Sequence, residues 1–300
     1  MALRALYDVA APAKLNLFLH VVGRRPDGYH LLQSVFVLID WCDTLHFERR
    51  GDERLSRHDL GAALPADDLC LRAAEALRKA SGQPFGADIS IDKQVPSGAG
   101  MGGGSSDAAA TLLALNRLWQ LHWPLDRLAG LAPGLGADVP FFLGNAAAVV
   151  EGIGERVTPI ALDPHWLAVL KPAASLDTRS IFASPLLGRS AEAAIVEGFS
   201  GGGSALSPAG VEGLWGWLSS HGHNDLQAAA EAQCGDVAVA SGLLQQAFGN
   251  SRMTGSGSAV FACAGSGKQP SGELPSALPA GWSGRMCRSL ASHPLAGWAG

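Results

Sequence analysis

The sequence contains no run of 18 apolar residues, which excludes an ordinary transmembrane helix. Its opening, MALRALYDVAAPA, has an arginine and an Ala-x-Ala-like end. However, Asp8 interrupts an apolar stretch that is too short for the core of a signal peptide. We therefore expect no contact with a membrane and no export.

Cysteine and charge are also scarce. The chain has only five cysteines and no CxxC pair, so neither a zinc site nor a disulfide framework is indicated, and a cytoplasmic location is expected. Charged residues make up 16% of the chain, its net charge is −5, and it has no stripe of Lys and Arg. We therefore expect no nucleic-acid partner.

Apolar residues and glycine are abundant instead. Apolar residues make up 47% of a 300-residue chain, enough for two packed lobes or one large domain. The 38 glycines gather in a few loops without a collagen-like period. Such clustering indicates sites that are built from backbone.

The first half of the chain alternates strand and helix patterns. Residues 11–50 carry β-formers on both sides of a PDG turn, which predicts two strands joined by a loop. Residues 67–82 have acidic residues first, basic residues late and then Gly82, which predicts a helix. Residues 87–96 predict a short strand that Pro96 ends.

Further along, SSDAAATLLALNRLW predicts a helix that Ser105 or Ser106 caps and that reaches Trp119. Residues 133–142 predict a loop that enters an apolar strand. A lobe boundary is expected near residues 158–164, before the strand pattern WLAVLKP. Residues 196–210 resemble a linker, and residues 265–281 form a second segment of low complexity.

Between Gly98 and Gly104, five of seven residues are glycine, and the segment lies between the predicted strand and the predicted helix. Backbone N–H groups and the positive end of a helix dipole bind anions there, and glycine lets phosphate approach closely. A Walker loop is excluded, because GSGK at 265–268 continues with Gln. GxGxxG also occurs, but the chain lacks a second strand ending in an acid at the required distance. A plain linker is disfavoured, since a capped helix follows directly.

The segment PSGAGMGGGSSDAA resembles the phosphate loop of the small-molecule kinase superfamily named after galactokinase, homoserine kinase, mevalonate kinase and phosphomevalonate kinase (GHMP kinases). This resemblance implies an α+β fold with two lobes. Residues 1–160 would form an ATP-binding lobe similar to ribosomal protein S5 domain 2, and residues 161–300 an α/β substrate lobe. The stretches APAKLNLFLHVVGRRPDGYH, LGADVPFFLGN and RMTGSGSAVFA are similar to members that phosphorylate a cytidine-diphosphate-linked polyol in isoprenoid biosynthesis.

The resemblance also implies the site residues. Asp138 would accept or orient the proton of the attacking hydroxyl, and Lys14 would keep Asp138 ionised and stabilise the developing alkoxide. ATP and its phosphates would be bound by Pro96, Ser97, Gly98, Ala99, Gly100, Met101, Gly102, Gly103, Gly104, Ser105 and Ser106. The substrate would be bound by Asn16, Tyr29, His30, Thr178 and Phe182. From residue type alone, charged residues in loops are more often simply solvated.

The implied cosubstrate is ATP, and Mg²⁺ is expected because clustered phosphate charge requires neutralising, although no carboxylate cluster reveals its protein ligands. Asp68 departs from the pattern, since the family often has Asn near the adenine there, and Met101 stands where Leu is usual. Two alternatives stay open: another acceptor of the superfamily, such as homoserine or mevalonate, or a nucleotide-binding module without catalysis.

Overall fold

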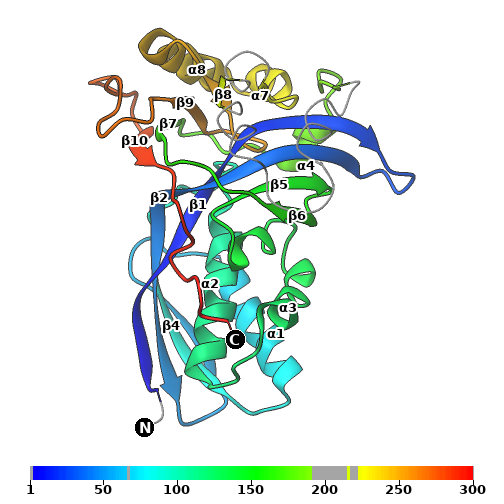
Figure 1. The fold of residues 1–300 in the computed structure, drawn as a ribbon, viewed down its shortest axis with the longest axis vertical. Coiled ribbons are helices and arrows are strands. Elements are labelled where there is room, and N and C mark those ends of the chain that lie inside the picture. Colours follow the sequence, from blue (N-terminus) through cyan, green and yellow to red (C-terminus); the bar gives the residue numbers. More distant parts are fainter. Residues whose placement is uncertain (1–2, 66–67, 191–214, 217–221, 300) are drawn as a thin grey trace.

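The computed structural model describes residues 3–65, 68–190, 215–216 and 222–299, which form two sheets with helices packed on them (Figure 1). The first sheet is ordered β3-β4-β2-β5-β6, with β1 paired to β2. The second is ordered β10-β7-β9-β8. The strands of the first sheet are β1 (Ala5–Arg24), β2 (His30–Arg50), β3 (Leu55–Asp59), β4 (Gly86–Asp92), β5 (Ala147–Gly152) and β6 (Arg156–Pro159). Those of the second are β7 (Trp166–Lys171), β8 (Arg252–Met253), β9 (Val260–Cys263) and β10 (Ser283–Arg288).

The β1–β2 hairpin connects the two lobes. Its strands are 20 and 21 residues long, several times the usual strand length, and their register shifts at four places. Such bulges bend and twist a long ribbon. The lower half of the hairpin belongs to the first lobe, and at Leu19 strand β1 bridges to Asn224 of the second (Figure 1).

Helices α1 (Leu69–Ser81) and α2 (Gly103–Leu118) cover one face of the first sheet (Figure 1). The ends of α1 follow from local chemistry and confirm the predicted helix: Asp68 accepts a hydrogen bond from the Leu71 N–H, and Gly82 ends the helix at φ +66°. Phe47, Leu77 and Leu112 are fully buried between sheet and helices. Burying each such side chain stabilises the fold by about 1.5–3 kcal/mol.

Two local predictions are wrong. Helix α2 begins after Gly102 rather than after a serine, because Gly102 adopts φ +70° and its carbonyl already accepts the Ser106 N–H, so both serines lie in the first turn. The end of residues 133–142, where the chain was expected to enter an apolar strand, forms the 3₁₀ turn η2 (Phe141–Leu143), and the strand β5 begins only at Ala147. The Phe141 N–H bonds the Asp138 carbonyl, and this turn bond replaces strand pairing.

The remaining short elements are α3 (Leu125–Ala129) and η1 (Ala132–Gly134) in the first lobe, and α4 (Thr178–Phe182), α7 (Gln227–Gln233) and α8 (Gly235–Phe248) in the second. Helix α8 packs Val237, Ala240 and Leu244 toward the second sheet. The chain passes from one sheet to the other between Pro159 and Trp166, close to the expected lobe boundary. The linker-like residues 196–210 lie outside the described residues. Among the described helices, none has both the length and the apolarity that crossing a bilayer requires.

Candidate active site

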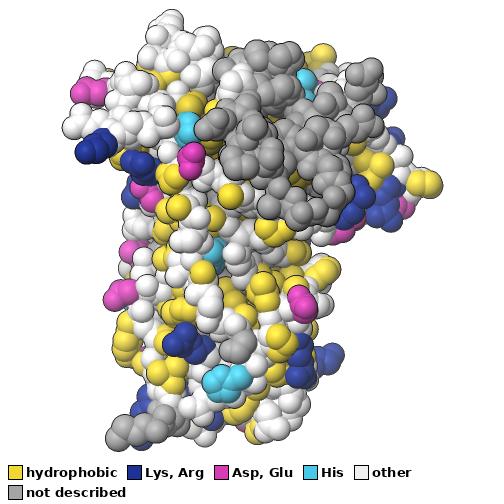
Figure 2. All heavy atoms as spheres, viewed as in Figure 1, with side chains coloured by type: hydrophobic (Ala, Val, Ile, Leu, Met, Phe, Trp, Pro, Cys, Tyr) yellow, Lys and Arg dark blue, Asp and Glu magenta, His cyan; other side chains and the backbone are white. Residues whose placement is uncertain are grey.

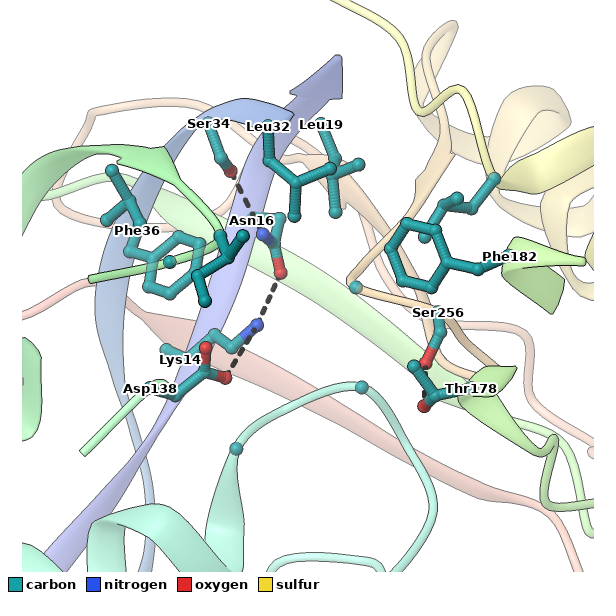
Figure 3. Close-up of a pocket in the computed structure, with 17 residues that line it drawn as sticks. Lys14, Asn16, Leu19, Leu32, Ser34, Phe36, Asp138, Thr178, Phe182 and Ser256 are labelled. Carbon is teal, nitrogen blue, oxygen red and sulfur yellow. Dashed lines mark hydrogen bonds and ion pairs between the residues drawn. The ribbon is translucent and has the colours of Figure 1, made fainter. Parts of the chain in front are cut away.

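A cavity of about 290 Å³ lies where the hairpin, the glycine loop and the second lobe meet (Figure 3). Lys14, Asn16, Ser34 and Phe36 extend into it from β1 and β2, opposite Thr178, Phe182 and Ser256 of the second lobe. Gly100, Gly102 and Asp138 complete its wall. Folding therefore brings seven of the predicted site residues to one place: Lys14, Asn16, Gly100, Gly102, Asp138, Thr178 and Phe182.

Lys14 is the buried cation of this cavity. Only 3% of the residue is exposed, and its Nζ lies 3.5 Å from Asp138 Oδ2, 2.5 Å from Asn16 Oδ1 and 4.3 Å from the centre of the Phe36 ring. Burial lowers the pKa of Lys14, and the Asp138 carboxylate opposes that change. Phe36 is both buried and part of the cavity wall.

Asn16 links the hairpin to the second lobe. Its Nδ2 donates to Ser34 Oγ at 2.9 Å, and its backbone N–H donates to Thr254 Oγ1 at 2.9 Å. Ser34 Oγ in turn donates to the Phe18 carbonyl at 2.5 Å. These buried bonds fix the side chain whose oxygen accepts from Lys14, so the ammonium is oriented as well as buried.

The glycine loop is held between β1 and the loop that precedes β9. The Met101 carbonyl accepts the Lys14 N–H at 2.9 Å, and the Gly98 and Ala99 carbonyls accept the N–H groups of Ser258 and Ala259. Gly100 has φ +72°, and a Cβ there would lie 2.3 Å from the Thr254 carbonyl oxygen. Only glycine permits this contact.

The predicted phosphate residues differ in their placement. Gly100 and Gly102 line the cavity with Lys14, whereas Ser97 and Gly104 line a second cavity of about 140 Å³. Ala99, Met101 and Ser106 are buried, so their side chains are not exposed to a ligand. The first N–H groups of α2 have no partner within the helix and carry the positive end of its dipole.

The second cavity contains an ion cluster that the sequence does not reveal. Lys93 pairs with the buried carboxylates of Asp43 and Asp107. Asp43 also accepts the Gln94 and Val95 N–H groups, and so fixes the backbone that leads into the glycine loop. Burial raises the pKa of Asp107 to about 7, Lys93 opposes this shift, and Asp43 adds to it. Asp68 lines the same cavity.

A third cavity, of about 660 Å³, adjoins the first and shares Leu32, Ile153, Thr178 and Phe182 with it. His30 and Phe182 stack here, with ring centres 5.2 Å apart and planes at 20°. Tyr29 is 62% exposed beside them. The remaining predicted substrate residues, Tyr29 and His30, therefore lie in a chamber next to Lys14 and Asp138.

The chain matches the family described as GHMP kinases N terminal domain over residues 68–145. It is also 62% identical, with all of both chains covered, to the 4-diphosphocytidyl-2-C-methyl-D-erythritol kinase of Methylibium petroleiphilum. The chain belongs to the 4-diphosphocytidyl-2-C-methyl-D-erythritol kinase family. It is therefore a kinase, with ATP as cosubstrate and a small molecule as substrate, rather than a module without catalysis.

Solved structures agree with this placement in the 4-diphosphocytidyl-2-C-methyl-D-erythritol kinase family. A 4-(cytidine 5'-diphospho)-2C-methyl-D-erythritol kinase crystal structure matches with a TM-score of 0.67 at 35% identity, covering 85% of this chain and 89% of that chain. Homoserine kinase from Cytophaga hutchinsonii matches with a TM-score of 0.62 at 16% identity, covering 87% and 85%. Identity that low shows the fold alone. The predicted two-lobed α+β fold of GHMP kinases is confirmed.

Proposed function

We propose that this kinase transfers the γ-phosphoryl group of ATP to the 2-hydroxyl of 4-(cytidine 5'-diphospho)-2-C-methyl-D-erythritol, a step of the non-mevalonate route to isoprenoid and terpenoid precursors. The observation that carries the proposal is the Lys14–Asp138 pair, which lies between the glycine loop and an adjoining chamber for the rest of the acceptor. The 62% identical relative bears this acceptor in its name.

In the proposed complex, the phosphates lie along the glycine loop. The adenine ring of ATP would occupy the cavity of Ser97, Gly104 and Asp107. The γ-phosphoryl group would reach the cavity of Gly100 and Gly102. The loop joins the two cavities, and its helix end favours negative charge. This route delivers the transferred group to the cavity wall that holds Asp138.

Asp138 is the proposed base, because its side chain is 30% exposed and lines the cavity where an acceptor hydroxyl would enter. Lys14 pairs with this carboxylate and stabilises negative charge on the attacking oxygen, an effect that its burial strengthens. Transfer is proposed to be direct, since phosphoryl transfer mainly requires alignment and charge neutralisation.

The diphosphate of the acceptor fits the positive charge around the third cavity. Arg24 and Arg179 line it, and within the described part of the chain neither forms an ion pair with a carboxylate. Burial lowers the pKa of His30, and the charges of Arg24 and Arg189 lower it further. Figure 2 shows Lys and Arg side chains gathered at the right-hand edge, where Figure 1 places the β1–β2 turn. Guanidinium groups bind phosphate oxygens in bidentate fashion.

Mg²⁺ is proposed as the ion that accompanies ATP. Among the residues that the structure describes, no three His, Cys, Asp or Glu side chains are grouped so as to hold an ion. That fits Mg²⁺, which keeps several waters and binds mainly to substrate phosphates. Ser105, in the first turn of α2 and partly exposed, is the proposed hydroxyl for the ion or the phosphates. When bound, the ion neutralises phosphate charge.

An ADP-release assay of the purified protein tests the proposal, with the cytidyl acceptor compared with homoserine and mevalonate. We expect turnover with the cytidyl acceptor alone. Asp138→Asn is expected to lower kcat about 10²-fold or more, whereas Asp163→Asn, at an exposed position between β6 and β7, leaves it unchanged. Full activity of the Asp138 variant refutes the assigned mechanism, and preference for another acceptor refutes the assigned substrate.

A further inference from the structure

The loop between β8 and β9, residues 254–259, belongs to the second lobe and meets both β1 and the glycine loop. Its first residue, Thr254, is fully buried. Asn224 fixes the backbone on both sides of Thr254, because its side-chain amide donates to the carbonyls of Met253 and Gly255, both at 2.8 Å. The second lobe therefore holds the Thr254 backbone in place.

The side chain of Thr254 reaches β1 of the hairpin. Its Oγ1 accepts the Asn16 N–H at 2.9 Å and donates to Asn16 Oδ1 at 3.3 Å. The same oxygen accepts a hydrogen bond from the Lys14 ammonium at 2.5 Å (Figure 3). Thr254 and Lys14 thus bond one oxygen, and all three residues are buried. In a buried and satisfied network each bond restricts the geometry of the next, so the Thr254 hydroxyl restricts where Lys14 Nζ lies.

The backbone of Thr254 faces the glycine loop. A Cβ at Gly100 would lie 2.3 Å from the Thr254 carbonyl oxygen, so the two backbones are in direct contact. Four residues further on, the Ser258 N–H donates to the Gly98 carbonyl at 3.2 Å. Thr254 therefore contacts the proposed phosphate site through its carbonyl, and its hydroxyl contacts the oxygen that holds the Lys14 ammonium.

We propose that Thr254 is a positioning residue, which links the Lys14 ammonium to the glycine loop across the boundary between the two lobes. This inference rests on the proposed function, because the place of Lys14 affects the rate only if Lys14 acts on the attacking oxygen. The phosphoryl group on the glycine loop and the charge that Lys14 supplies then depend on one residue for their separation. Groups displaced by about 1 Å lose on the order of 10²-fold in rate, so this hydroxyl affects kcat beyond its effect on stability.

Three substitutions separate the hydroxyl from the rest of Thr254. Thr254→Val keeps the shape without the hydroxyl, Thr254→Ser keeps the hydroxyl without the methyl, and Thr254→Ala removes both and serves where the Val variant does not fold. We expect Thr254→Val and Thr254→Ala to lower kcat about 10–100-fold. The KM for ATP stays within about threefold, because the backbone contact with Gly100 remains. Thr254→Ser is expected to keep kcat within about threefold, because Oγ1 keeps both bonds to Asn16.

Ser289→Ala is the matched control. Ser289 is buried, and its Oγ accepts the His165 N–H at 2.8 Å, so the substitution also removes the hydroxyl acceptor of a backbone N–H. Ser289 lies outside the three cavities described above. We expect a lower melting temperature in both Ser289→Ala and Thr254→Val, and a lower kcat in Thr254→Val but not in Ser289→Ala.

Titration of Lys14 by NMR in the protein alone supplies a reading that needs no acceptor substrate. Burial lowers the pKa of Lys14, and a hydrogen bond to the ammonium raises it. Because Asn16 Oδ1 is less firmly placed in Thr254→Val, we expect the pKa of Lys14 to be lower there than in wild type, Thr254→Ser or Ser289→Ala.

Wild-type kcat or an unshifted Lys14 titration in Thr254→Val overturns the proposal. A loss of kcat in Thr254→Ser or Ser289→Ala as large as in Thr254→Val also overturns it, because the hydroxyl at Thr254 would then have no particular role. A wild-type protein that does not turn over the cytidyl acceptor refutes the proposed function instead, and the Lys14 titration still decides this one.

Discussion

A methyl group at Gly100 tests whether contact between two loops positions the phosphates. In Gly100→Ala the new Cβ would lie 2.3 Å from the Thr254 carbonyl oxygen and 3.1 Å from Gly257 N, at φ +72°. Real Cβ atoms do not approach closer than 3.0 Å, so the loops must separate by about 0.7 Å. Gly82→Ala is the matched control, since Gly82 has φ +66° and nothing within 4 Å of an added Cβ.

Both variants place an alanine at positive φ, but only Gly100→Ala also forces two loops apart. A left-handed alanine costs about 1–2 kcal/mol at either position, so the free energy of unfolding falls by that amount in Gly82→Ala. Gly100→Ala adds the forced separation and is expected to lose more. Because the displaced loop carries the phosphates, its kcat is expected to fall about 10–100-fold, whereas Gly82→Ala keeps wild-type kcat.

Denaturant unfolding measures the stability term, and ADP release at saturating acceptor measures kcat and the KM for ATP. Equal losses of unfolding free energy in the two variants would show that the loops at Gly100 and Thr254 can separate at no cost in stability. Wild-type kcat and KM in Gly100→Ala would refute the claim that this contact positions the nucleotide.

Three further outcomes are expected. Phe47→Ala lowers the free energy of unfolding by about 3–5 kcal/mol because Phe47 is fully buried, whereas Val239→Ala, at an exposed position, changes it by less than about 0.5 kcal/mol in denaturant titrations. The pKa of Asp107 is raised to about 7 in the folded protein, against 3.8 for an ordinary Asp. At pH values between these two, the folded state therefore binds more protons than the unfolded state. Its contribution to stability is therefore present below pH ~4, is lost as pH rises to about 7, and is level above that. Asp107→Asn flattens this part of the profile of unfolding free energy against pH, and an unchanged slope would contradict the assignment. Lys14→Met, which removes the buried ammonium, lowers kcat at least about 10²-fold with a smaller change in the KM for ATP, and comparable losses in both would show a binding role instead.

Elements with local causes were predictable from sequence. Helix α1 begins at Asp68 and ends at Gly82 because both caps act within one turn. The β1–β2 hairpin follows from alternation around a turn, and the glycine loop between strand and helix indicated a backbone phosphate site. The serine cap and the early start of the strand after residues 133–142 were wrong because neighbouring backbone, Gly102 in one case and the Asp138 turn in the other, supplied competing hydrogen bonds.

By itself, then, the sequence determined the family, the glycine loop and the elements whose signals span a few residues. Only the tertiary structure decided that Lys14 Nζ lies 3.5 Å from Asp138 and that Lys93 joins Asp43 to Asp107. These pairs are far apart along the chain, and no local pattern encodes their separation. Their distances are set by packing of the hairpin, the glycine loop and α2 against one another, because a close-packed interior fixes positions that the backbone alone leaves free.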